Sequence, residues 1–133
     1  MKVLLAPFLI IGMTFYSNPL GDLRWKYRVL LVSGPATLVE EQLNLLETSP
    51  DELEDRNLLV FDLNKKIQSL PEGRIHSDDV KSYFGLDGND FRVLLIGKDG
   101  GVKINSTQFV KPIDLFATID RMPMRQAEMR QRN

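Results

Sequence analysis

Few side chains in this sequence could carry out a reaction. Cysteine is absent, which excludes disulfides, thiolate zinc sites, iron–sulfur clusters and cysteine nucleophiles. The one histidine, His76, stands beside Asp78 and Asp79, three groups that could hold a metal ion. Ser77 followed by two acids is more typical of a helix start, so we expect a helix cap here and neither a metal nor another cofactor. The lone histidine gives no Ser-His-Asp spacing with Ser33 or Ser77.

Polar residues with a possible binding role occur at one strand-to-helix turn and at the start of a later strand. Ser33 ends an apolar run, and Thr37 and Glu40 have the spacing of a capping box, in which both side chains satisfy free amides of the first helical turn. Arg92 stands at the start of the third apolar run. A guanidinium beside a helix N-terminus favours a carboxylate or phosphate ligand. The alternative is a solvated charge or an ion pair with Asp90 or Glu40.

The elements that position these residues follow from apolar periodicity and turn signals. Predicted strands lie at residues 27–32, 57–62, 91–96 and 102–105. Predicted helices follow Thr37, begin at Pro50, run from Ser77 to Phe84 and begin at Pro112, the last being stopped or kinked by Pro123. Residues 64–74 are polar and predict a loop. Residues 98–101 lie between two strands, so their glycines predict a tight turn and not a phosphate-binding loop.

The order of these elements predicts an α/β domain. Parallel strands need long crossovers, whereas antiparallel neighbours can use a tight turn. We therefore expect crossovers between the first three strands and a hairpin between the third and the fourth. A four-stranded mixed sheet with helices on both faces is a thioredoxin-like three-layer sandwich. A small flavodoxin-like sheet is the runner-up, and it would need a parallel strand at residues 102–105.

Length and charge limit the classes of protein that this chain can represent. Its 133 residues fit one domain, which we place at residues 18–133. The net charge of -1 gives no whole-chain basic field, so we expect no nucleic-acid partner. The C-terminal segment is locally basic and rich in methionine, and such a helix can dock on a protein partner or an anionic surface. The candidate partner-binding residues are Arg121, Met124, Arg125 and Met129.

The first seventeen residues have the composition of a secretory leader. Lys2 precedes an apolar run at residues 3–13, and a polar segment follows it. The run is shorter than the roughly 20 residues of a membrane-spanning helix. We expect a signal peptide at residues 1–17 and a periplasmic or secreted protein. A retained leader would leave a membrane-anchored or cytoplasmic protein, and any membrane association would pass through this segment.

Two motifs make the chain similar to a known domain family. They are the turn Gly97-Lys98-Asp99-Gly100-Gly101 and the segment Asp120-Arg121-Met122-Pro123-Met124-Arg125. Together with the apolar strands, they resemble the DUF4174 family, a domain of small bacterial exported proteins and of sushi-repeat and coiled-coil-domain-containing extracellular proteins. The resemblance covers about residues 23–129. It implies a thioredoxin-like, peroxiredoxin-related fold with no established activity.

The resemblance also implies where a reactive group would stand. In peroxiredoxins a cysteine lies where the first strand turns into the first helix, and if Thr37 matches their threonine, Glu40 takes the place of that cysteine. Arg92 matches an arginine that faces the reactive pocket, and the proline that presents peptides in thioredoxins is missing. Glutamate cannot perform thiol redox chemistry. We therefore expect a noncatalytic module that binds a protein or a small anionic ligand through Ser33, Thr37, Glu40 and Arg92. The alternative is an enzyme of peroxiredoxin descent that depends on a partner's redox group.

Overall fold

A computed structural model describes residues 17–132 of the chain. The elements are η1 (Gly21–Leu23), β1 (Arg28–Ser33), α1 (Ala36–Glu47), α2 (Pro50–Asp55), β2 (Leu58–Asp62), β3 (Ile67–Leu70), β4 (Gly73–His76), α3 (Ser77–Phe84), β5 (Arg92–Ile96), β6 (Val102–Ser106), α4 (Pro112–Asp120) and α5 (Pro123–Arg130). The four predicted strands and the predicted helices are all present. The predicted leader lies outside the described residues, except for Ser17, and stays a prediction.

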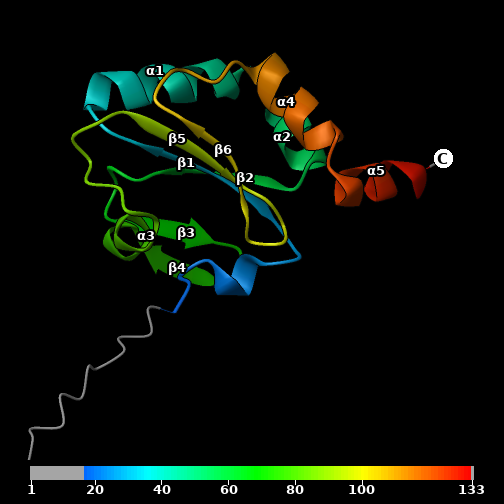
Figure 1. Ribbon diagram of the computed structural model, residues 1–133, viewed down its shortest axis with the longest axis horizontal. Helices are drawn as coiled ribbons and strands as arrows, with labels where there is room; N and C mark the ends of the chain where they lie inside the picture. Colours follow the sequence, from blue (N-terminus) through cyan, green and yellow to red (C-terminus); the bar gives the residue numbers. More distant parts are fainter. Residues whose placement is uncertain (1–16, 133) are drawn as a thin grey trace, which may run out of the picture.

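The main sheet has the strand order β2-β1-β5-β6. β1 is parallel to β2, whereas β5 is antiparallel to both β1 and β6. The prediction of a crossover between the second and third strands is wrong, because β5 runs antiparallel to β1 and β2. The long connection between β2 and β5 contains α3 but returns the chain in the opposite direction. Helices α1, α2 and α4 lie on one side of the sheet, and α3 lies on the other (Figure 1). This mixed three-layer arrangement is consistent with the predicted thioredoxin-like sandwich.

Two apolar clusters fill the spaces on the two faces of the sheet. Because side chains alternate along a strand, Leu30 and Val32 of β1 pack with α1 and α4, whereas Val29 and Leu31 pack toward α3. Gln42 of α1 is fully buried in the cluster between the sheet and helices α1 and α4. Its side chain both donates to and accepts from the backbone of Val110, so the segment before α4 is tied to α1.

The prediction of a loop at residues 64–74 is wrong, because β3 and β4 form an antiparallel hairpin there. It packs beside α3 (Figure 1). The sequence does not indicate β3, because the β3 side chain that faces the protein interior is polar. Gln68 is buried and donates hydrogen bonds to the Asp62 carbonyl and the Ser77 hydroxyl, while Ile67 is exposed. An inward glutamine therefore conceals the alternation by which a half-buried strand is recognised.

The predicted capping box is also wrong. Helix α1 begins at Ala36, with Pro35 in the N-cap position and no side-chain cap. Thr37 and Glu40 consequently lie inside the helix, each two residues past the positions that a capping box requires. The final helix does break at Pro123, as predicted, and this proline then opens α5.

Gly34 allows β1 to turn into α1 close to the start of β5. Its φ is +133°, and a Cβ there would lie 2.6 Å from the Cα of Phe91. We therefore predict that Gly34→Ala lowers the free energy of unfolding by about 2 kcal/mol or more, since both the positive φ and the backbone overlap oppose it. Urea denaturation measures the change. Gly21→Ala is the matched control, because nothing lies within 4 Å of its added Cβ; equal losses in the two variants would contradict the prediction.

Candidate functional site

Two of the four predicted ligand-binding residues lie side by side. Ser33 at the end of β1 is the register partner of Arg92 at the start of β5. Both lie on the face of the sheet that packs toward α3, the same face as Leu31 and Leu94. Ser33 is fully buried, and its hydroxyl has no hydrogen-bond partner among the described residues. The guanidinium of Arg92 donates to the side-chain oxygen of Asn105 on β6, with a distance of 3.1 Å from Nε. Arg92 is thus held by its neighbouring strand, without an ion pair to Asp90 or Glu40 among the described residues.

The other two predicted residues do not join this pair. Thr37 and Glu40 are exposed on α1, which packs through Val39 against the opposite face of the sheet. The four side chains therefore do not line one cleft. The position that the resemblance assigns to a reactive group is held by an exposed glutamate on the far side of the sheet from Arg92.

Buried charges gather instead at the opposite end of β1. Four cations lie there with only 1–8% of their surface exposed: Arg28, Arg56, Lys98 and Arg125. Arg28 opens β1, Arg56 directly precedes the segment leading into β2, and Lys98 follows β5. Neighbouring strand ends thus bring three cations to one edge of the sheet, and α5 supplies the fourth. Buried cations require anionic partners, because an unpaired buried charge is strongly unfavourable.

Glu128 of α5 is the partner of the first pair of cations. Its Oε2 accepts from Nη2 of Arg28 at 3.1 Å, and its Oε1 accepts from Nζ of Lys98. Lys98 also donates to Oδ1 of Asn57 at 2.9 Å. Burial would raise the pKa of Glu128, but the hydrogen bonds from Lys98 and Arg28 outweigh it and hold the pKa below its ordinary value. Glu128 is therefore an anion at neutral pH.

Two aspartates pair the remaining cations. Asp120, at the end of α4, accepts from Arg56 at 2.8 Å and from Arg125 at 3.0 Å. Asp55, at the end of α2, accepts from Arg125 at 2.6 Å and also contacts Arg132. Hydrogen bonds from Arg132 and Arg125 lower the pKa of Asp55 to about 2. Burial opposes ionisation of Asp120, yet its bonds to Arg56 and Arg125 lower its pKa as well. This network fixes α2, α4 and α5 to one another.

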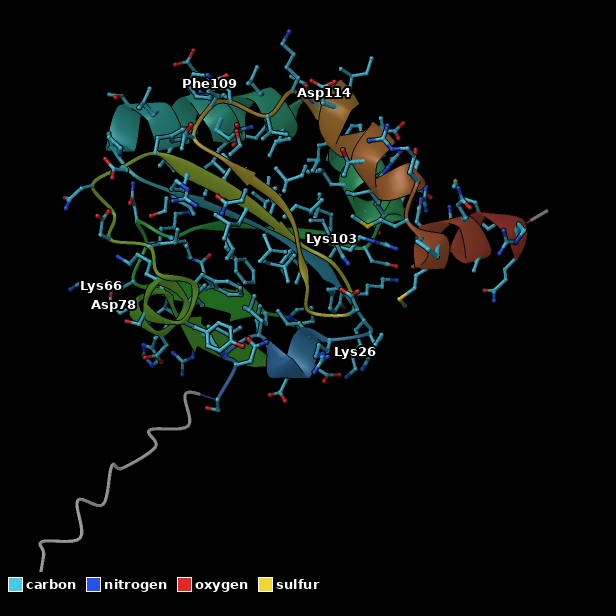
Figure 2. All side chains as sticks on the ribbon, viewed as in Figure 1. Lys26, Lys66, Asp78, Lys103, Phe109 and Asp114 are labelled. Atoms are coloured by element: carbon cyan, nitrogen blue, oxygen red, sulfur yellow. The ribbon has the colours of Figure 1, made fainter. Side chains whose placement is uncertain are left out.

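A cavity of about 480 Å³ opens beside the network, within the usual size range of small-molecule sites. It lies between the β5–β6 turn and the junction of α4 with α5. Its lining consists of Arg28, Gly97, Lys98, Asp99, Val102, Lys103, Thr118, Arg121, Met122, Pro123 and Met124. Lys103, labelled in Figure 2, stands at the β5–β6 hairpin on the side where α5 lies. The lining combines four cations with aliphatic and thioether surface.

The predicted partner-binding residues separate into two groups. Arg125 is buried in ion pairs with Asp55 and Asp120 of the same chain, so its charge holds α5 against α2 and α4. Arg121 and Met124 are exposed and line the cavity, while Met129 is half-buried. The sequence analysis did not identify Arg28 and Lys98 as residues of the cavity lining. Charged residues at the ends of otherwise apolar strands are the one signal that could have identified them.

The structure describes no metal centre within residues 17–132, since no three potential ligands are grouped to hold an ion. His76 is exposed at the start of α3. None of the helices described is long and apolar enough to cross a membrane.

Comparison with known families supplies the identification. The family described as a domain of unknown function (DUF4174) matches residues 19–128, which include the sheet, the four buried cations and the cavity lining. The chain belongs to the DUF4174 family. Comparisons with curated proteins and with solved structures found no match. The DUF4174 match confirms the resemblance drawn from the glycine turn and the Asp120–Arg125 segment.

The ion pairs predict a loss of stability in acid. Asp55, Asp120 and Glu128 have pKa values that folding lowers, so the unfolded chain binds protons first as the pH falls. Their contribution is complete above about pH 5 and is lost as the pH falls toward the folded pKa values. We expect the melting temperature, followed by circular dichroism, to drop between about pH 5 and pH 2.

A pair of variants tests the origin of that acid sensitivity. Asp120→Asn removes one of the depressed pKa values and should flatten the dependence of melting temperature on pH. Glu40→Gln is the control, because this exposed carboxylate has no ion pair among the described residues. A melting temperature that stays constant through the acid range, or variants with identical slopes, would count against the network.

Proposed function

We propose that this DUF4174 domain is a noncatalytic module that binds a small anionic ligand. The observation that carries the proposal is the cavity lined by Arg28, Lys98, Lys103 and Arg121. The anions nearest these cations are Asp99 in the lining and Glu128 behind it. Two positive charges therefore remain in excess, and they favour an anion entering the cavity.

The chemistry at the other end of β1 supports binding over catalysis. The chain has no cysteine, and Glu40, at the place of a peroxiredoxin's reactive residue, is exposed and apart from Arg92. A general acid–base or nucleophilic site needs groups that converge on one reacting atom. Ser33 is buried, no group among residues 17–132 accepts a hydrogen bond from its hydroxyl, and Thr37 faces solvent.

An activity assay separates the binding module from the enzyme of peroxiredoxin descent. We predict that the purified protein consumes hydrogen peroxide with a dithiol donor no faster than buffer, because no side chain of the chain can be oxidised and reduced by a thiol–disulfide cycle. A panel of carboxylates and phosphates should instead raise the melting temperature saturably. Turnover above buffer that Arg92→Ala abolishes would defeat the proposal, and Lys66→Ala, at an exposed lysine outside the cavity lining, serves as the control.

We also propose that the chain is exported through residues 1–17. The composition of that segment supports the proposal. The predicted outcome is a mature protein that begins at Asn18 and is found in the periplasm or medium. Mass spectrometry of protein recovered from its native cells measures the N-terminus, and an intact Met1 would contradict the release of a mature protein.

A further inference from the structure

We propose that the cavity beside the α4–α5 junction binds an amphipathic monocarboxylate, with the carboxylate at Arg28, Lys98 and Arg121 and the apolar part along Val102, Met122 and Met124. This inference rests on the proposed function and specifies its ligand. Most side chains that line the cavity are either cationic or apolar.

The floor of the cavity is prepared for a carboxylate. Arg28 is 1% exposed, and its buried Nε has no hydrogen-bond partner among the described residues, so its guanidinium adds positive charge to the cavity floor from just beneath the surface. Lys98 is nearly as buried, and its ammonium is fixed by Glu128 and Asn57. Cations fixed in this way lose little freedom when a ligand arrives, and preorganisation of this kind favours binding.

The start of α5 adds positive potential at the same place. Pro123 and Met124 form its first turn and line the cavity, and no side chain caps this end. The first hydrogen bond of the helix is donated by Gln126, to the carbonyl of Met122. The amides of Met124 and Arg125 therefore have no partner within the helix, and the helix dipole favours an anion beside them.

The rim of the cavity explains why the ligand should carry an apolar part. Val102 is 49% exposed and Met124 is 38% exposed, although both belong to the lining. Apolar side chains beside a charged floor match a molecule with a charged end and a hydrocarbon body. Methionine adapts its shape to such a body, because its side chain is unbranched and polarizable. Inorganic anions would leave this surface in water.

Decanoate, used below the concentration at which it forms micelles, is the probe. Isothermal titration should give saturable binding, with affinity rising along acetate, hexanoate and decanoate by about fourfold for each buried methylene. Decylamine should not bind, because its charge is opposite. Decyl phosphate and inorganic phosphate form the other arms and test whether the headgroup or the chain determines recognition.

Arg121→Ala should weaken decanoate binding about tenfold or more, since a charge-assisted hydrogen bond is lost. Arg121 has no ion pair among the described residues, so the variant should keep its fold. Val102→Glu is a second variant, which places a negative charge on the exposed rim and should also abolish binding. Arg130→Ala is the matched control, an exposed arginine of α5 outside the lining.

The outcomes separate the two proposals. Binding of decanoate that depends on Arg121 and Val102 but not on Arg130 supports this inference. Inorganic phosphate binding as tightly as decanoate would overturn the amphipathic ligand while leaving the anion-binding module intact. Decanoate binding that is unchanged in Arg121→Ala and in Val102→Glu would overturn the location. Failure of every anion to bind would overturn both the inference and the proposed function.

Discussion

The pairing of Glu128 with Arg28 and Lys98 is the constraint on which the C-terminal half of the structure depends. Arg28 opens the central strand β1 and Lys98 leaves β5, so both cations belong to the sheet, whereas the carboxylate belongs to α5. Removing one partner of a buried ion pair typically costs about 3–5 kcal/mol, because a buried charge is left uncompensated. Helix α5 must therefore lie at this edge of the sheet. Its mean hydropathy alone would not place it there, since few of its side chains are buried.

The aspartates extend this constraint to the neighbouring helices. Asp120 contacts Arg56 and Arg125, so the end of α4 is fixed against both the segment leading to β2 and α5. Arg56 also lies over the ring of Phe116, 4.4 Å from its centroid, which adds a cation–π interaction to the ion pairs. The break at Pro123 falls between these fixed points. A cavity therefore opens at the junction, with walls whose positions are set by buried ion pairs.

The fold could be predicted from sequence where one physical signal dominated. The strands β1 and β5 are apolar runs buried on both faces, and β2 is a partly buried apolar run at the edge of the sheet. Pro112 marks a helix start, and Pro123 marks the break after that helix. The hairpin β3–β4 escaped prediction because its inward side chain is Gln68. The antiparallel direction of β5 could not be predicted, because a long connection can return the chain either way. The ion pair between Arg28 and Glu128 spans 100 residues of sequence, and no local pattern reports such a pairing.

The two ends of β1 differ in how their polar residues are arranged. The family resemblance predicted a binding site at the carboxyl end, whereas the cavity lies at the amino end. At the carboxyl end, Ser33 is buried and unpaired, Arg92 is bonded to Asn105, and Glu40 faces solvent beyond the sheet. These groups do not converge on a common point. At the amino end, Arg28 and Lys98 converge on one carboxylate and line a cavity. A buried cation is stable only if an anion accompanies it, and here the cations outnumber the anions. The excess of positive charge at this end of the sheet is therefore the physical basis of the proposed anion binding.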